Sequence, residues 1–258
     1  LYMVISGTPA LFKVGILDIL FGTVWEPAAK DPSFGILFVI LTSIVGTFLA
    51  VLIGVPIGVM TAVFLAEVAP TKVANIVRPA IELLAGIPSV VYGFFGLVVI
   101  VPIIQQLTGT SGKGVLTASV LLGIMILPTI IGVSESAIRA VPESYYEGAL
   151  ALGDTHERSV FCAVLPAAKS GIMAGVILGV GRAIGETMAV IMVAGNQPVI
   201  PGSVLAGVRT MTANIVLEMG YAAGLHREAL IATGVVLFVF ILIINVLFSL
   251  IKKGDSNG

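Results

Sequence analysis

Two charged residues, Arg182 and Glu186, interrupt a long apolar stretch in the segment GRAIGETMAV at residues 181–190. An arginine at the centre of a membrane helix costs about 2.5–3.5 kcal/mol on insertion scales, so such a residue usually has a function. A guanidinium stays charged at any relevant pH and carries five donors in a planar fork that suits tetrahedral oxyanions. The residue types therefore predict a path for an anion across a membrane.

A local ion pair is the alternative interpretation of the same two residues. Arg182 and Glu186 are four apart, which places them on one face of a continuous helix, where each can neutralise the other. An arginine that precedes a glutamate is the weaker order for such a pair, which favours a further role. The sequence places both residues near the middle of an apolar span.

A polar segment, EGALALGDTHERSVFCAVLP at residues 147–166, lies between two apolar runs. Pro142, which precedes this segment, suits the first position of a helix that leads into it. Gly153 can adopt the left-handed conformation that ends this helix, and Asp154 or Thr155 can cap the next one. The segment therefore predicts two short helices that meet at a glycine.

Proline ends this polar segment and should also end its second helix. Pro166 cannot continue a helix smoothly, so we expect the turn into the next membrane span there. A loop of this design is typical of a docking surface for a soluble partner. The alternative is an amphipathic surface loop that binds nothing.

Composition indicates a membrane protein. Of 258 residues, 58% are hydrophobic and 10% are charged, far from the usual values for a soluble domain. The net charge of −1 and the scattered basic residues argue against a nucleic-acid partner. Cys162 is the sole cysteine and His156 and His226 are the only histidines, so neither an internal disulfide nor a Cys/His metal site is expected.

Enzyme chemistry finds no support in the motifs. The segment SGKG at residues 111–114 resembles part of a phosphate-binding loop, but Gly114 stands where that motif needs Ser or Thr. Neither histidine has an evident nucleophile and carboxylate with it. We therefore expect no catalytic residue, no metal and no cofactor in this chain, and an energy source elsewhere.

Five segments are long and apolar enough to cross a bilayer, which takes about 20 residues. Residues 1–35 are less regular and are interpreted as the remnant of a truncated first span with an extracytoplasmic segment, although a processed signal anchor would look similar. Residues 36–258 would then form the transmembrane domain, and the intact protein would have six spans. The five predicted spans are residues 36–66, 80–106, 115–138, 168–194 and 228–251.

Basic residues predict the orientation and some local contacts. Lys and Arg are slightly more frequent on the side that holds residues 139–167, which places that loop in the cytoplasm and residues 195–226 outside.

Glu135 and Arg139 have the favourable spacing and order for a pair at a helix end. Three charged residues, Arg209, Arg227 and Glu228, are expected to be solvated on the outer side. Gly171, Gly175 and Gly179 recur every four residues and predict close approach of another helix.

The polar loop and three further segments carry a resemblance to a known family. Five loop residues, Glu147, Ala149, Gly153, Leu165 and Pro166, have the spacing of the EAA loop of ABC-importer permeases. DPSFGIL at 31–37, IELLAGIPSVVYGFFGL at 81–97 and RAIGETMAVIMVAGN at 182–196 resemble the PstC-type permease of the phosphate-specific ABC importer. The resemblance implies an all-α, polytopic transmembrane helix bundle of the type I ABC-importer permease kind, with a cytoplasmic coupling loop at about 139–167.

The same resemblance implies a function and a set of partners. The chain would be the permease subunit of an ATP-driven importer of inorganic phosphate, multi-pass in a bacterial or archaeal cytoplasmic membrane and in contact with lipid. A PstA-type second permease, PstB-type ATP-binding subunits and an extracytoplasmic phosphate-binding protein would complete the importer. In that family the Arg and Glu of the RAxGET motif are taken to serve translocation, and they map onto Arg182 and Glu186. A permease for sulfate or molybdate, or a secondary anion transporter or channel, remains an alternative.

Overall fold

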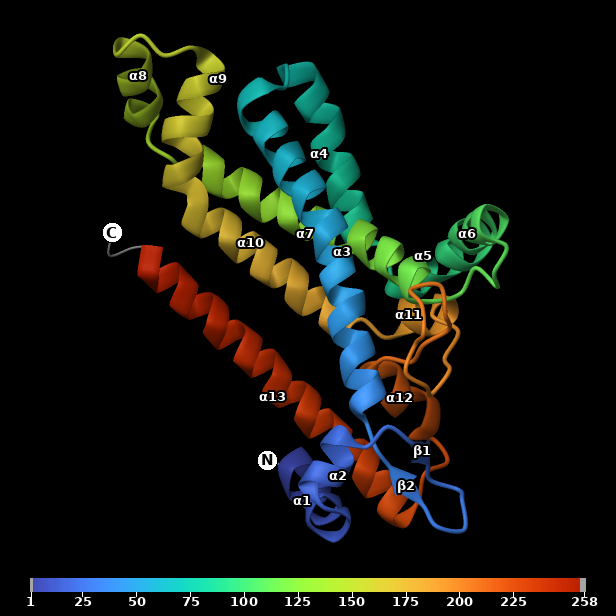
Figure 1. Cartoon of the computed structure of the whole chain (residues 1–258). Helices are drawn as coiled ribbons and strands as arrows, with labels where there is room; N and C mark the ends of the chain where they lie inside the picture. The colour runs from blue at the N-terminus through green and yellow to red at the C-terminus, as the bar shows by residue number, and fades with distance from the viewer. Residues whose placement is uncertain (1, 256–258) are drawn as a thin grey trace. The chain divides into compact units, whose positions relative to one another are not determined.

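The computed structural model describes residues 2–255, whose regular structure is almost entirely helical (Figure 1). Two short strands form an antiparallel pair in which Trp25 lies opposite Phe34. The prediction of an all-α fold is confirmed. The elements are α1 (Tyr2–Val14), α2 (Ile16–Phe21), β1 (Trp25–Glu26), β2 (Ser33–Phe34), α3 (Leu37–Val63), η1 (Phe64–Val68), α4 (Thr71–Gly86), α5 (Ser89–Phe95), η2 (Gly96–Ile100), α6 (Val101–Thr108), α7 (Val115–Arg139), α8 (Glu143–Ala151), α9 (His156–Ser159), η3 (Val160–Val164), α10 (Leu165–Gly185), α11 (Met188–Val193), α12 (Met211–Glu218) and α13 (Gly224–Asp255), where η marks a π-helical turn.

Five helical segments among the described residues have the length and apolar character to cross a bilayer. This number matches the prediction, and the first, third and fifth segments lie within a few residues of the predicted ones. The second and fourth begin or end elsewhere. The five segments are Leu37–Val68, Ser89–Thr108, Val115–Arg139, His156–Gly185 and Gly224–Leu247.

The predicted span at residues 80–106 is wrong because the chain breaks at Ile87 and Pro88. Ile87 has extended backbone angles, φ −70° and ψ 128°, and α4 ends at Gly86. A residue before proline is disfavoured in the helical conformation, and proline itself fits the start of the next helix. Residues 80–86 therefore belong to α4, and the membrane-spanning segment begins at Ser89.

The chain forms two compact units, to which α3, α7, α10 and α13 each contribute residues. In the first unit, Trp25 and Phe34 of the β-pair are buried with Phe38 of α3 and Leu230 of α13. The N-terminal residues are thus part of this unit's core, and the boundary at residue 35 stays a prediction. The first unit comprises the described residues up to Ala50, Pro88–Leu122 and Ile184–Val246, and the second Val51–Ile87, Gly123–Ala183 and the described residues from Leu247.

In the second unit, α7 packs closely against α10 through the glycines of α10. A Cβ added to Gly175 would lie 3.1 Å from Ser134 Oγ, and one added to Gly179 would lie 2.9 Å from Cγ1 of Ile130. Small residues allow helix backbones to approach in this way, and the predicted role of the glycine stripe is confirmed. The third glycine, Gly171, meets Ala137.

A second pair of glycines brings α3 against α7. A Cβ on Gly54 would lie 2.9 Å from the Gly123 carbonyl oxygen, and one on Gly58 would lie 2.8 Å from Cγ2 of Ile130. Ile130 is fully buried between the two glycine surfaces. α7 lies between α3 and α10, which explains why 67% of the residues in its most apolar stretch are buried, against 22–39% for the other spans.

Candidate functional site

The predicted docking loop folds as two short helices joined at Gly153, as expected from the sequence. Pro142 precedes α8, and Gly153 has φ +92°, a conformation in which a Cβ is strained. Gly153 N–H donates to the Leu150 carbonyl and Asp154 N–H to the Ala149 carbonyl, at 2.9 and 3.2 Å. These two bonds form a Schellman motif, which satisfies carbonyls at the end of α8.

The start of α9 is fixed by its own side-chain contacts. Thr155 Oγ1 accepts a hydrogen bond from Arg158 N–H, so Thr155 is the cap of α9. Tyr146 Oη of α8 lies 2.8 Å from His156 Nδ1, and the two rings meet edge to face. The contact between Tyr146 and His156 joins the two helices across the turn and was not predicted from the sequence.

The loop exposes apolar side chains around this rigid turn. Leu152 is 90% exposed, and Leu150, Tyr145 and Phe161 are also exposed. Contiguous exposed apolar groups usually mark a contact surface. Of the five motif residues, Glu147, Gly153 and Pro166 are exposed, and Ala149 and Leu165 are half-buried.

Pro166 does not end the second helix, so the predicted turn into the next span is wrong. A π-helical turn, η3, directly precedes α10, and helical structure continues without a break from His156 to Gly185. In a regular α-helix the proline ring would clash with the carbonyl four residues earlier. The wider π-turn accommodates a residue that lacks an N–H. The loop's second helix and the fourth membrane-spanning segment are therefore one continuous helix.

Arg182 lies in the last turn of α10, not at the middle of a span. It is half-buried, and its Nη1 donates to Thr129 Oγ1 of α7 at 3.3 Å. The C-terminal end of a helix favours a positive charge. Because Thr129 is a neutral acceptor, this bond orients the guanidinium without neutralising it.

Glu186 lies outside α10, which ends at Gly185, so the prediction of one shared helix face is wrong. Its Oε1 accepts hydrogen bonds from the N–H groups of Thr187 and Ala189 at 3.0 and 3.1 Å. A carboxylate at the start of α11 satisfies free N–H groups and favours the positive end of the helix dipole. The predicted span at 168–194 therefore breaks at Glu186, where the apolar pattern gives no sign of an end.

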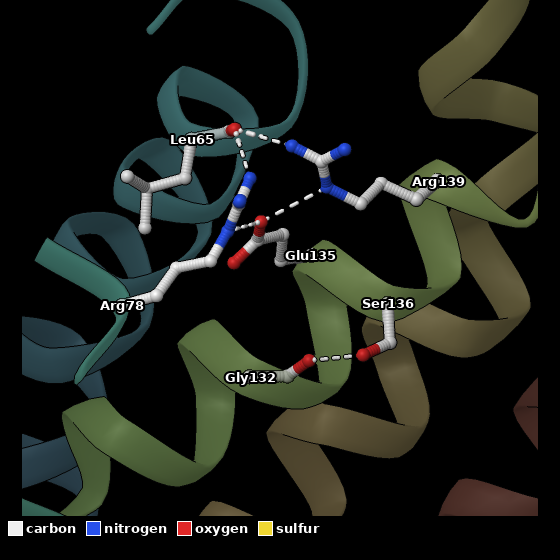
Figure 2. Close-up of polar contacts among 6 residues, drawn as sticks. All are labelled: Leu65, Arg78, Gly132, Glu135, Ser136 and Arg139. Carbon is white, nitrogen blue, oxygen red and sulfur yellow. Dashed lines mark hydrogen bonds and ion pairs between the residues drawn. The ribbon is translucent and has the colours of Figure 1, made fainter. Parts of the chain in front are cut away.

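A charge cluster in the second unit centres on Glu135, whose side chain is 11% exposed (Figure 2). Its Oε1 accepts from Arg139 Nε at 3.0 Å, which confirms the predicted pair, and from Arg78 Nε of α4 at 2.7 Å, a contact that spacing did not predict. Both arginines also donate from Nη2 to the Leu65 carbonyl oxygen, at 2.9 Å for Arg139 and 3.2 Å for Arg78. The cluster joins α4, α7 and η1.

A second cluster, in the first unit, corrects the expectation that Arg209 is solvated. Arg209 is 13% exposed at its side chain, and its Nη1 pairs with Glu218 Oε1. Glu218 Oε2 accepts from Trp25 Nε1 at 2.9 Å and lies 2.8 Å from His226 Nε2. The carboxylate of Glu218 therefore serves three partners. Sequence spacing gave no signal, because Trp25 is 193 residues away along the chain.

Residues 54–254 match the model of the binding-protein-dependent transport system inner membrane component. The chain belongs to this family. It is therefore an ABC-transporter permease, a transport subunit and a multi-pass membrane protein.

Individual relatives place the permease more closely within the family. It is 39% identical to a probable ABC transporter permease, YqgH, of Bacillus subtilis, with 96% of this chain and 84% of that protein covered. It is 36% identical to the phosphate transport system permease protein PstC of Xylella fastidiosa, with 100% and 86% covered. Its fold is similar to a chain of the MetNI methionine ABC transporter in inward-facing conformations, at a TM-score of 0.68 and 21% identity over 85% of this chain and 95% of that one. The fold is thus the expected permease helix bundle.

Proposed function

We propose that this chain is the permease subunit of an ATP-driven importer of inorganic phosphate. The observation that carries the proposal is the similarity along the whole chain to PstC of Xylella fastidiosa, a phosphate transport system permease protein. The residue chemistry agrees with it, since Arg182 offers a planar set of donors to a tetrahedral anion.

Energy would come from ATP-binding subunits of the PstB type that dock on residues 139–167. The exposed apolar residues around Gly153 supply a contact surface, and the Schellman turn fixes its shape. Glu147, Ala149, Gly153, Leu165 and Pro166 are the residues proposed to form the coupling loop. A PstA-type permease and an extracytoplasmic phosphate-binding protein would complete the importer.

The continuous helix from His156 to Gly185 provides the link between the docking loop and Arg182. Leu165 and Arg182 are separated by 17 residues of unbroken helix, or about 25 Å at 1.5 Å per residue. A push on the loop therefore moves Arg182 as part of one rigid element. This coupling would have been weaker if Pro166 had ended the helix.

Arg182 and Glu186 are proposed to act on the anion in different ways. Arg182 is held at the end of α10 by a neutral hydroxyl, so its charge is available to offset that of a passing phosphate. Glu186 stabilises the start of α11 through two backbone hydrogen bonds. Its negative charge repels anions, which keeps phosphate from remaining bound beside Glu186.

Uptake of radiolabelled phosphate into vesicles tests the proposal. The vesicles contain the full-length protein with its partner permease and ATPase. The phosphate-binding protein is supplied on the extracytoplasmic side of the membrane. We expect uptake that requires ATP and is unaffected by excess sulfate or molybdate. ATP-independent uptake would indicate a secondary transporter, and transport of another oxyanion alone would reassign the substrate.

A further inference from the structure

Arg78 has a second carboxylate near it besides the one that it binds. A cavity of about 340 Å³ in the second unit is lined by both arginines of the Glu135 cluster, by Glu135 itself and by Glu82 of α4. Glu82 is exposed and follows Arg78 by four residues on the same helix. Arg78 can therefore reach either Glu135 of α7 or Glu82 of its own helix.

The four charges divide evenly between the two helices. α4 carries Arg78 and Glu82, and α7 carries Glu135 and Arg139, each pair at the i,i+4 spacing that allows contact within a helix. In the structure, Glu135 accepts from both arginines. Arginine before glutamate is the weaker order, which explains why Arg78 selects Glu135 while α4 and α7 are together.

Two of the four bonds of the cluster connect α7 to α4 or to η1. The bond from Arg78 to Leu65 joins α4 to η1, which are neighbours along the chain because α4 begins three residues after η1 ends. The bonds from Arg78 to Glu135 and from Arg139 to Leu65 cross to α7. Separation of α4 and η1 from α7 breaks these two of the cluster's four bonds, together with the apolar contacts of the buried group that holds Leu65, Ile131 and Ile138.

Separation would normally be very unfavourable, because breaking a partly buried ion pair leaves a charge without a partner. Here Arg139 keeps Glu135, and Arg78 keeps the Leu65 carbonyl and gains Glu82. The cavity between the side chains leaves room for Arg78 to turn towards Glu82. The charges therefore balance in both arrangements.

We propose that Glu82 is a positioning residue for transport: it takes over Arg78 from Glu135 when α4 and α7 move apart, so that the cluster opens and closes in each cycle. Arg139 ends α7, and α8 of the docking loop begins four residues later. The exchange thus occurs next to the loop through which the ATPase would act. This inference rests on the proposed import function.

Replacement of Glu82 tests the exchange in the assembled transporter. Glu82→Gln removes the second partner of Arg78 and leaves every bond of the closed cluster in place, so folding is unaffected. We expect the turnover number of phosphate uptake to fall about tenfold, because the activation free energy of the transport cycle rises, with KM unchanged. Glu82→Asp should restore most of the rate, and Glu67→Gln, which removes a half-buried carboxylate from η1 outside the cavity, should transport normally.

Spin-label distances show whether the two helices separate. In a Cys162→Ser background, labels at Ile76→Cys on α4 and Ala140→Cys after α7 occupy exposed positions outside the cavity. We expect the distance distribution of the otherwise unmodified complex to differ between the nucleotide-free and the ATP-trapped states, and that of Glu82→Gln to stay at the nucleotide-free values. Equal distributions in both states, or normal uptake by Glu82→Gln, would overturn the exchange. Failure of the unmodified complex to take up phosphate would instead overturn the import function.

Discussion

Arg182 Nη1 of α10 donates to Thr129 Oγ1 of α7, so the proposed anion-binding arginine is oriented by the most buried helix of the second unit. Close glycine packing between α7 and α10 holds the two residues in register. The guanidinium is therefore fixed by a scaffold that a motif alone does not reveal.

Thr129→Val tests this orientation. Valine has nearly the same shape but cannot accept the hydrogen bond, so Arg182 loses its fixed direction. Because a hydrogen bond to a charged group contributes about 1.5–3 kcal/mol, we expect the rate of phosphate uptake to fall at least about tenfold. Thr129→Ser, which keeps the hydroxyl, serves as the control, and normal uptake by Thr129→Val would show that the bond is dispensable.

The sequence predicted those features whose cause is local. Turn chemistry at Gly153 and the cap at Thr155 depend on neighbouring residues, and the structure confirms both. The apolar pattern likewise identified five spans, because their length is set by the bilayer. It missed the breaks at Pro88 and Glu186, where a proline or a side-chain carboxylate ends the helix within an apolar run.

Long-range polar contacts were beyond prediction for a different reason. Glu135 with Arg139 was predicted from spacing, but the addition of Arg78 depends on how α4 lies against α7. Glu218 and Arg209 are joined by the packing of α12 and the loop before it, which no periodicity encodes. Arg209 was therefore interpreted as solvated, although its side chain is only 13% exposed.

Gly171→Ala is expected to destabilise the protein by separating α10 from α7. The added methyl group would overlap Ala137, and overpacking of this kind typically costs about 1–3 kcal/mol. Gly181→Ala on the same helix is the matched control, since a Cβ there meets nothing within 4 Å. Thermal unfolding of the detergent-solubilised protein measures the difference, and equal unfolding temperatures for the two variants would contradict the packing role.

Gly153→Val is expected to distort the docking loop. A β-branched residue at φ +92° is strained by at least about 1–2 kcal/mol, and relief of that strain breaks the Schellman bonds. We expect less ATPase to co-purify with the variant. Gly148→Ala, within α8 and with open space around its Cβ, should retain assembly. Undiminished assembly and coupling of Gly153→Val would argue against this loop as the docking site.

Glu218→Gln is expected to lower the stability of the first unit more than an equivalent change at the surface does. The carboxylate neutralises Arg209 in a nearly buried site and also accepts from Trp25, so an amide leaves a charge unpaired and turns a donor towards donors. Loss of one partner of a buried ion pair costs about 3–5 kcal/mol. Glu228→Gln is the control, because its pair with Lys13 at 3.1 Å is exposed and such pairs contribute about 0–1 kcal/mol.

Trp25 makes this experiment specific, because it is the only tryptophan in the chain and its Nε1 donates to Glu218. Its intrinsic fluorescence therefore reports on the cluster directly during denaturant unfolding. We expect Glu218→Gln to alter the emission of the folded protein and to lower the unfolding midpoint, whereas Glu228→Gln alters neither. If both variants unfold at the wild-type midpoint, the Glu218 cluster does not stabilise the first unit.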